Sequence, residues 1–384
     1  MNYEIDRDEA SAALPLTSDP LPFVTVEAAR DFAMSYRVDS RLNEIVGGFD
    51  SPFYQAGLAG YSDVAMRMIA RKHGCPFCMT EALLDRMVIT PGKARGKADL
   101  SVIQDNVPGS EADHPIGGQI IGAQADEMAA AAKILVDMGY DLIDVNLACP
   151  VKKIGRKFRG GHFLSHPKDA IEVLRAVREV VPADIPTTVK LRCGASDDAE
   201  SEERFSMIFD AVYDFGYSWA TVHGRTVKQK YNGPSNWDIL RDLVARYPDR
   251  LILGSGDIYS ATDIFRMLSY TRVQGVSVAR GCIGNPWIFR EARMLMAGEI
   301  PNGPTLEEQR EVLLEHFTIC CAEHGERQAG KLMRKFAIYF SRHHPESDAV
   351  KTAFIKVKTL DEWKGVISRY YETSVVEEAS CGWE

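Results

Sequence analysis

The chain has 384 residues, an apolar content of 45% and a formal net charge of −9. This length accommodates one large domain and a smaller one, and the apolar share is ordinary for a globular protein with a full core. The acidic balance argues against indiscriminate binding of nucleic acid. No apolar run approaches the ~18 residues that a membrane helix needs, and the acidic start lacks a signal-peptide core. We therefore expect a cytoplasmic protein with no membrane partner.

Three regions follow one another along the chain. Residues 1–50 are predicted to be an extension, which contains the proline-rich run LPLTSDPLPF and a short helix capped by Thr25. Residues 51–300 alternate apolar, strand-like runs with helical patterns about eight times. Residues 301–384 show helical periodicity only. This order predicts an α/β fold, a (β/α)8 TIM barrel followed by a small C-terminal helical domain.

The alternative to the barrel is a doubly wound open sheet. It is disfavoured because no G-x-G-x-x-G pattern follows the first predicted strand.

Two sequence features concern thiols and charge. The pair Cys75 and Cys78 forms a lone CxxC, for which no second ligand pair is obvious, so buried or half-buried thiols are favoured over a redox or metal role. The window from Arg327 to Arg369 holds ten Lys or Arg against four Asp or Glu. A solvated face is the usual explanation of such a run, but in an acidic protein it raises the odds of an anionic ligand.

Polar residues stand at the ends of several predicted strands, where barrel enzymes carry their chemistry. They are Glu81, Gln119, Asn146, Lys190 and His223, with Cys149 shortly after the fourth strand. A buried polar group is costly unless it is paired, and one alone is most often a satisfied core group. Four of them on different strands, Gln119, Asn146, Lys190 and His223, are better explained by a polar ligand at one mouth.

Glycine-containing loops at the remaining strand ends refine this ligand. The loop residues are Gly57, Leu58 and Ala59 after the first strand, Ser255, Gly256 and Asp257 after the seventh, and Ala279, Arg280 and Gly281 after the eighth. Backbone N–H groups at the last two loops form a phosphate site in many barrels, and Arg280 adds a charge. A planar ligand with a phosphate, such as flavin mononucleotide (FMN), meets both requirements, with Lys190 and Gln119 bonding the polar edge of the ring.

Longer segments carry a resemblance to a known family. The segments DVNLACPVKKI, VKLR, TVHGRTVKQKYNGPSNW, GSGDI and ARGCIGNPWIF stand in this order. They resemble the tRNA-dihydrouridine synthases, flavoenzymes that reduce uridine in tRNA, from about residue 55 to residue 286. Four positions depart from the family pattern: Gly57 and Leu58 replace Pro and Met, Ser255 replaces Asn, and Phe336 replaces His in the tail.

The resemblance implies an FMN-dependent reduction of the uracil 5,6 double bond, with NADPH as reductant and tRNA as partner. No obligate protein partner is implied. It implies that Cys149 donates the proton to C5, since a free thiol with a pKa of about 8.5 is largely protonated at neutral pH. The implied substrate-binding residues are Glu81, Asn146, Lys153, Arg225, Gln229, Tyr231, Arg334 and Lys335.

Further roles follow from the same resemblance. Residues 51–300 would form the FMN-binding catalytic domain, and residues 301–384 would bind tRNA. Lys152, Lys153, Arg156, Lys157 and Arg159 would meet tRNA phosphates. For Trp237 we expect packing rather than substrate contact.

Two other functions stay open at this point. One is an FMN oxidoreductase that acts on a free pyrimidine, such as dihydroorotate or a dihydropyrimidine, which would not need the basic helical tail. The other is a non-catalytic RNA-binding protein on a retired barrel, which the intact Cys149, Lys190 and His223 argue against.

Overall fold

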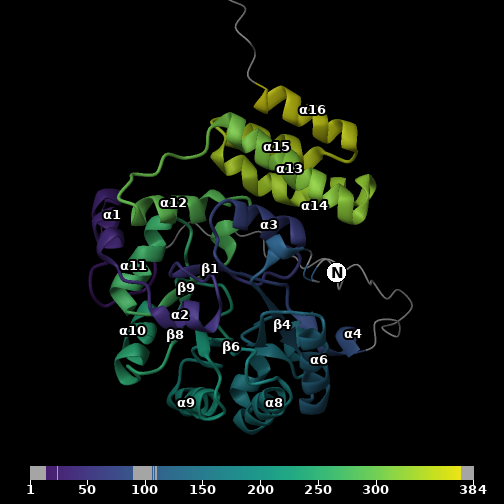
Figure 1. Ribbon diagram of the computed structural model, residues 1–384. Coiled ribbons are helices and arrows are strands. Elements are labelled where there is room, and N and C mark those ends of the chain that lie inside the picture. The colour runs from purple at the N-terminus through teal and green to yellow at the C-terminus, as the bar shows by residue number, and fades with distance from the viewer. Residues whose placement is uncertain (1–13, 24, 90–105, 107, 109, 373–384) are drawn as a thin grey trace, which may run out of the picture. The chain divides into compact units, whose positions relative to one another are not determined.

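A computed structural model describes residues 14–23, 25–89, 106, 108 and 110–372. The chain divides into two compact units, one running to Cys282 and including Pro286–Pro301, and the other formed by Ile283–Asn285 and the residues from Asn302 on. Figure 1 shows both units.

The first unit is built on a parallel sheet. Its strands are β1 (Phe53–Gln55), β2 (Cys78–Met79), β3 (Leu83–Leu84), β4 (Ile116–Ile121), β5 (Leu142–Leu147), β6 (Thr187–Arg192), β7 (Trp219–His223), β8 (Ile252–Ser255) and β9 (Gly275–Val278). They lie in the order β2-β1-β9-β8-β7-β6-β5-β4-β3, and β2 also pairs with β4, which closes the sheet. β2 and β3 pair with successive parts of β4, so together they fill one position of an eight-stranded barrel. The predicted (β/α)8 barrel is confirmed, and closure excludes the open sheet.

Helices surround this barrel, as Figure 1 shows. They are α1 (Val26–Ser35), α2 (Ser40–Ile45), α3 (Val64–Lys72), α4 (Asp85–Ile89), α6 (Ala125–Asp137), α7 (Lys152–Gly155), α8 (Pro167–Val180), α9 (Ala199–Asp214), α10 (Trp237–Arg246), α11 (Ala261–Thr271) and α12 (Trp287–Met296). α8 shows why such segments fold as helices. Pro167 occupies its first turn, and Ala170, Val173, Leu174 and Val177 recur at helical spacing and are buried.

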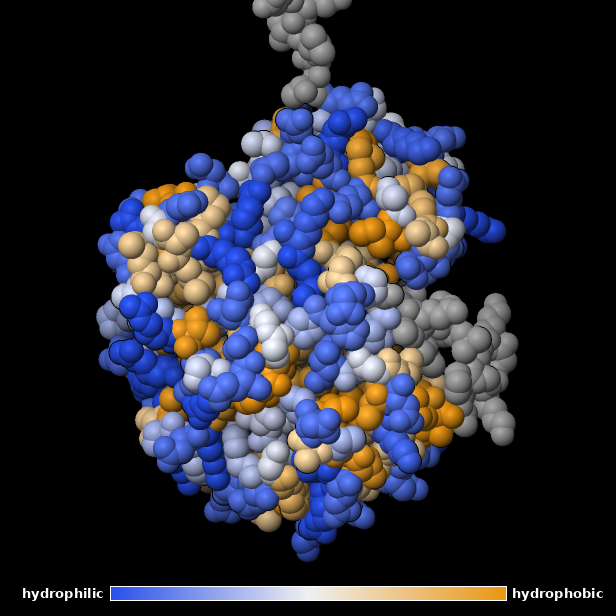
Figure 2. All heavy atoms as spheres, in the orientation of Figure 1, coloured by the Kyte–Doolittle hydropathy of each residue, from blue (hydrophilic) through white to orange (hydrophobic). Residues whose placement is uncertain are grey.

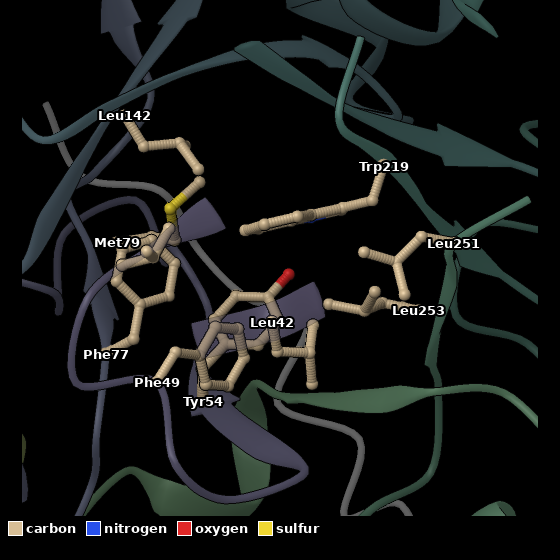
Figure 3. Packing of buried hydrophobic residues seen from close by; sticks show 10 residues of the cluster. Leu42, Phe49, Tyr54, Phe77, Met79, Leu142, Trp219, Leu251 and Leu253 are labelled. Carbon is tan, nitrogen blue, oxygen red and sulfur yellow. The ribbon is translucent and has the colours of Figure 1, made fainter. Parts of the chain in front are cut away.

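The floor of the barrel is a cluster of large buried hydrophobic side chains (Figure 3). Leu142 and Trp219 begin their strands, so they lie at the N-terminal end of the barrel. Leu42 of α2 and Phe49 close this end from below, and both are fully buried. The second half of the N-terminal extension therefore contributes to the barrel core.

The extension also contacts the barrel at Leu16. Leu16 forms a single parallel bridge with Asn236, through Leu16 N–H to Ser235 O at 2.8 Å and Trp237 N–H to Leu16 O at 2.9 Å. The predicted cap of α1 is confirmed, since the Thr25 side chain accepts the N–H of Ala28.

Side chains along each strand point alternately into and out of the barrel, and the inward ones fill its interior. Above the floor, the interior contains a polar layer in which the Tyr54 hydroxyl bonds Thr221 Oγ1 at 3.0 Å and Thr188 Oγ1 donates to Asp144 at 2.6 Å. Two residues further along the strands, Asn146 and Lys190 are register partners at the C-terminal mouth. Every second residue of a strand points into the barrel, so the register of the paired strands places the floor, the polar layer and the mouth at successive inward positions.

The second unit is helical, as predicted for the end of the chain. Its helices are α13 (Leu306–His324), α14 (Glu326–Phe340), α15 (Ser347–Lys356) and α16 (Leu360–Tyr371). Capping boxes with Thr305 and Thr359 begin α13 and α16. In its core Phe317 stacks on Trp363 with ring centroids 4.7 Å apart.

Hydrophilic residues dominate the face drawn in Figure 2, and apolar residues gather there in separate groups. Among the described residues, no helix combines the length and the apolar character that crossing a membrane requires.

Candidate active site

Gln119, Asn146 and Asp144 form a hydrogen-bonded group at and just below the barrel mouth. Asn146 Nδ2 donates to Gln119 Oε1 at 2.7 Å, and Gln119 Nε2 donates to Asp144 Oδ2 at 2.8 Å. These bonds fix both amide orientations, so the polar edge that the two side chains present is preorganised. Asp144 is a residue that the sequence reasoning missed. The sequence did indicate its place, because Asp144 stands two positions before Asn146 and so lies on the same inward face of β5.

Lys190 faces the same space from β6. Its Nζ is buried and makes no hydrogen bond to any described residue. Burial lowers the pKa of Lys190 to about 7, against the opposing charge of Asp144. Burial likewise raises the pKa of Asp144 to about 6, although bonds from Thr188 and Gln119 favour its ionised form. A buried ammonium without a hydrogen-bond partner is costly, so this position suits a ligand that accepts from it.

The loop after β5 holds Cys149 beside this group. Asn146 Oδ1 accepts the backbone N–H groups of Ala148 and Cys149 at 3.0 and 3.1 Å, so one side chain orders both the mouth and the thiol loop. Burial raises the pKa of the Cys149 thiol above its ordinary value, against opposing effects of the Val151 backbone and Arg192. The thiol is therefore protonated at neutral pH and available as a proton donor.

Two glycines let the chain return against Cys149. A Cβ on Gly160 would lie 2.9 Å from Cys149 Cβ, and one on Gly161 would lie 2.7 Å from Val227 Cγ2. Gly161 N–H also donates to Cys149 O at 3.0 Å. Only glycine permits this approach, so the pair fixes the position of the thiol loop.

Arg192, a second residue that the sequence reasoning missed, ties the thiol loop to the loop after β7. Its Nε donates to Ala148 O at 2.9 Å, and its Nη1 donates to Thr226 O at 2.9 Å and to Lys230 O at 2.6 Å. Its guanidinium also lies 5.3 Å from the ring centroid of Tyr231. The signal was the inward alternation of β6, where Arg192 follows Lys190 by two positions.

His223 ends β7 at the mouth. Its Nε2 lies 3.3 Å from Arg225 Nη1, and because a guanidinium only donates, the imidazole accepts here and carries its proton on Nδ1. Burial, followed by the charges of Arg192 and Lys190, holds the pKa of His223 well below its ordinary value. His223 is therefore a neutral hydrogen-bond donor through Nδ1.

The loop after β7 uses two of its predicted substrate contacts internally. Arg225 is buried and donates through Nη2 to both Asp257 oxygens, at 2.7 and 2.8 Å. Gln229 Nε2 donates to Asn232 O and Pro234 O, both at 3.0 Å. These two side chains hold the loop together, and Tyr231 of the same loop exposes 48% of its surface.

The loops after β8 and β9 meet at Asp257. Its carboxylate accepts from Arg225, from Ser235 N–H at 2.6 Å and from Arg280 Nη2 at 3.3 Å. The Asp257 side chain is therefore an internal brace between these loops, and the predicted role of this position in cofactor binding stays a prediction.

Close contacts at two glycines determine the backbone path of the loops after β8 and β9. A Cβ on Gly256 would lie 2.3 Å from Ser235 Oγ, and one on Gly281 would lie 2.1 Å from Ile258 O. Ser235 Oγ is buried and has no hydrogen-bond partner among the described residues. Ser255 is buried at the end of β8, level with His223, and Ala279 precedes the 3-10 turn η3 (Arg280–Cys282).

Trp237 is fully buried and donates to Gly256 O at 3.1 Å, so the expected packing role is confirmed.

The loop after β1 borders the amide group from the other side. A Cβ on Gly57 would lie 2.3 Å from Thr80 O and 3.3 Å from Gln119 Oε1. Leu58 N–H donates to Ser62 Oγ at 2.9 Å, and Ala59 is exposed. The Glu81 carboxylate accepts Gly60 N–H at 2.6 Å, so it holds this loop.

The basic segment after Cys149 differs from the prediction at one position. Arg159 is buried and pairs with Asp85 at 3.2 Å, so it cannot meet a phosphate at the surface. Arg156 and Lys157 are exposed. The side chains of Lys152 and Lys153 lie outside the described residues.

The remaining predicted contacts belong to the helical unit. Arg334 is exposed on α14 and donates to Val357 O at 3.3 Å. Lys335 Nζ lies 4.8 Å from the ring centroid of Phe336, which is fully buried and packs on His316. At the position where the family pattern has His, Phe336 is thus a core residue.

The CxxC thiols of Cys75 and Cys78 are buried with their sulfurs 3.8 Å apart, as expected for core thiols.

Known proteins resemble this chain over most of its length. The family model described as "Dihydrouridine synthase (Dus)" matches residues 54–374. A "Probable tRNA-dihydrouridine synthase" of Mycobacterium tuberculosis (strain CDC 1551 / Oshkosh) is 30% identical over 86% of this chain and 85% of its own length. "tRNA-dihydrouridine synthase B" of Serratia marcescens is 28% identical over 84% of this chain and 92% of its own.

Among solved structures, histamine dehydrogenase from Rhizobium sp. 4-9 resembles the chain with a TM-score of 0.52 and 14% identity. The match covers 76% of this chain and 51% of that one, about half its length. A structure of 2-naphthoyl-CoA reductase matches with a TM-score of 0.51 and 11% identity, over 70% of this chain and 53% of that one. At these identities the likeness concerns the barrel fold alone.

Proposed function

Since the chain belongs to the dihydrouridine synthase family, a family of oxidoreductases, we propose that it reduces the 5,6 double bond of uridine in tRNA. The proposal assigns FMN as cofactor, NADPH as reductant and Cys149 as proton donor. The observation that carries it is the barrel mouth. There the Lys190 ammonium, which has no hydrogen-bond partner among the described residues, faces the same space as the Asn146–Gln119 amide pair and the loop that carries the Cys149 thiol.

The residues present fit a flavin nucleotide. Lys190 Nζ and Ser235 Oγ are buried polar atoms without a hydrogen-bond partner in the described chain, and a ligand would satisfy both. Glycine at 57 and 256 lets the loops after β1 and β8 pack directly against Thr80 and Ser235, where a Cβ would clash. Lys190 and Gln119 would hold the polar edge of the ring, while the loops at Ser255, Gly256 and Arg280 would hold the phosphate. When bound and reduced, FMN supplies the hydride for C6 of the uracil.

The chain itself supplies the proton and the orientation. The Cys149 thiol gives its proton to C5, and the thiolate left behind is reprotonated from water, so the base gains one hydride and one proton. Asn146 orients the thiol loop through the N–H groups of Ala148 and Cys149. His223 donates from Nδ1 to the ring or the base, and Tyr231 contacts the nucleotide. The uridine must leave the RNA stack to reach the mouth.

Charge and composition support tRNA as the substrate. The segment from Arg327 to Arg369 carries ten Lys or Arg against four Asp or Glu in a chain whose net charge is −9. Arg334, Lys351 and Lys356 belong to this basic segment, which would hold the tRNA body.

The test is reduction of unmodified tRNA by the FMN-loaded protein with NADPH, with dihydrouridine mapped by position. Cys149→Ala should lose about 10²-fold or more in rate while it retains FMN, because a positioned acid contributes that much. Cys193→Ala is the matched control, since Cys193 is a half-buried thiol just after the neighbouring strand β6. Full activity of Cys149→Ala would refute the assignment of the acid. Turnover of free uracil or orotate without RNA would favour a small-molecule oxidoreductase.

A further inference from the structure

One side chain near the site is held in an unusual way. Phe158 follows the short helix α7, has φ of 59° and exposes 63% of its surface. A single exposed apolar residue is ordinary, but a bulky aromatic residue in the left-handed region is uncommon and unfavourable. Such conformations persist where the surrounding structure imposes them, and they cluster at functional positions.

The Phe158 ring is braced from one side. It meets the His162 ring edge to face at 5.0 Å and 71°, and His162 stacks on His166 at 4.3 Å and 29°. Burial, and then the charge of His166, lowers the pKa of His162, which keeps this imidazole neutral and suited to stacking. His162 lies within the 3-10 segment η2 (Gly160–Ser165) and His166 follows it directly, so the exposed ring has a fixed support and loses little entropy when it is covered.

The location of Phe158 connects it to the thiol. Gly160 lies directly against Cys149, where a Cβ would come within 2.9 Å of Cys149 Cβ. Phe158 precedes that contact by two residues, a span of at most about 7 Å of chain. Arg156 and Lys157 come immediately before it and are exposed. An exposed aromatic ring beside exposed cations is the combination that binds unpaired bases of a nucleic acid.

We propose that Phe158 is a stacking platform for an unpaired nucleobase of the RNA substrate, next to the uridine that reacts. The inference rests on the proposed function and adds a subsite to it. Extruding the uridine breaks its stacking on neighbouring bases. Phe158 restores stacking to one of these bases, while Arg156 and Lys157 meet adjacent phosphates. The ring itself carries no charge, so its contribution is independent of salt, whereas that of the two cations is not.

The experiment measures the affinity of the FMN-loaded protein for unmodified tRNA by fluorescence anisotropy over a range of salt concentrations. Phe158→Leu should weaken binding by about 5- to 100-fold, the range that stacking of one base provides, without changing the slope of log K against log salt. Lys157→Ala should weaken binding and reduce that slope by about one. Phe158→Trp should keep the affinity, and its indole fluorescence should be quenched when tRNA binds.

Met207→Ala is the matched control, because Met207 is an apolar side chain of α9 with 49% of its surface exposed. It should bind tRNA as the unchanged protein does. The Phe158 variants should also keep their melting temperature and FMN affinity, so that a loss reports on RNA alone. Wild-type affinity of Phe158→Leu, or no quenching in Phe158→Trp, overturns the platform and leaves the proposed function intact. If the unchanged protein neither binds nor reduces tRNA, the proposed function fails first, and the platform fails with it.

Discussion

The buried ammonium of Lys190 makes the stability of the cofactor-free protein depend on pH in a defined direction. Burial lowers its pKa from 10.5 to about 7, while the unfolded chain retains the ordinary value. Between these two values the unfolded chain binds more protons than the folded chain, so stability rises as the pH rises from about 7. Below pH 7 both states hold the proton, and the full cost of burying the charge, about 5 kcal/mol at 1.4 kcal/mol per pKa unit, is present.

Lys190→Met removes this cost and keeps an apolar chain of similar length. Its stability advantage over the unchanged protein should be largest near pH 6 and should shrink by about 2–3 kcal/mol by pH 9. Asp144 acts in the same direction, because burial raises its pKa to about 6 and without Lys190 its ionised form loses a favourable charge. For a barrel of this size the change corresponds to about 4 °C in melting temperature.

The assay is thermal unfolding of the cofactor-free proteins at closely spaced pH values from 6 to 9, with the melting temperatures compared pairwise. Lys133→Met, at an exposed position of α6, is the control for removing a lysine charge, and its difference in melting temperature from the unchanged protein should not vary with pH. A difference between Lys190→Met and the unchanged protein that is equally flat over this range would refute the argument that Lys190 is buried without a partner. With FMN added, Lys190→Met should also bind the cofactor more weakly.

Three further outcomes follow from the site. The rate of tRNA reduction should fall at alkaline pH as the Cys149 thiol loses its proton. Because burial raises the pKa of Cys149, the fall should come above the ordinary thiol pKa of about 8.5. A rate that rises in this range would exclude the thiol as the acid. Arg225→Met should lower stability by about 3–5 kcal/mol and weaken FMN binding, since it leaves the Asp257 carboxylate buried with a partner removed; unfolding and FMN titrations that match the unchanged protein would contradict this. Gly161→Ala should slow tRNA reduction about tenfold or more by displacing the thiol loop, whereas Gly155→Ala, with no atom within 4 Å of its added Cβ, should not; equal rates would argue against a tightly held loop.

The internal roles of several predicted ligands could not be read from the sequence. Arg225, Gln229 and Asp257 stand in motifs that look like binding residues, yet the structure uses their polar groups to hold loops together. Arg159 lies in a run of cations but pairs with Asp85, 74 positions away in the chain. Spacing along the chain shows where a charge stands, whereas the partner that neutralises it comes from a distant segment.

The sequence by itself determined the fold class and the polar strand ends. Period-2 alternation and helical spacing are local properties, so the barrel, the helical end and the positions of Gln119, Asn146, Lys190 and His223 follow from short windows. Only the tertiary structure decided which of these groups are paired. Within the described parts of the chain Lys190 has no hydrogen-bond partner, while Asn146 orders the thiol loop. Burial and contact of these groups depend on closing the sheet between β2 and β4 and on loops that meet across the mouth.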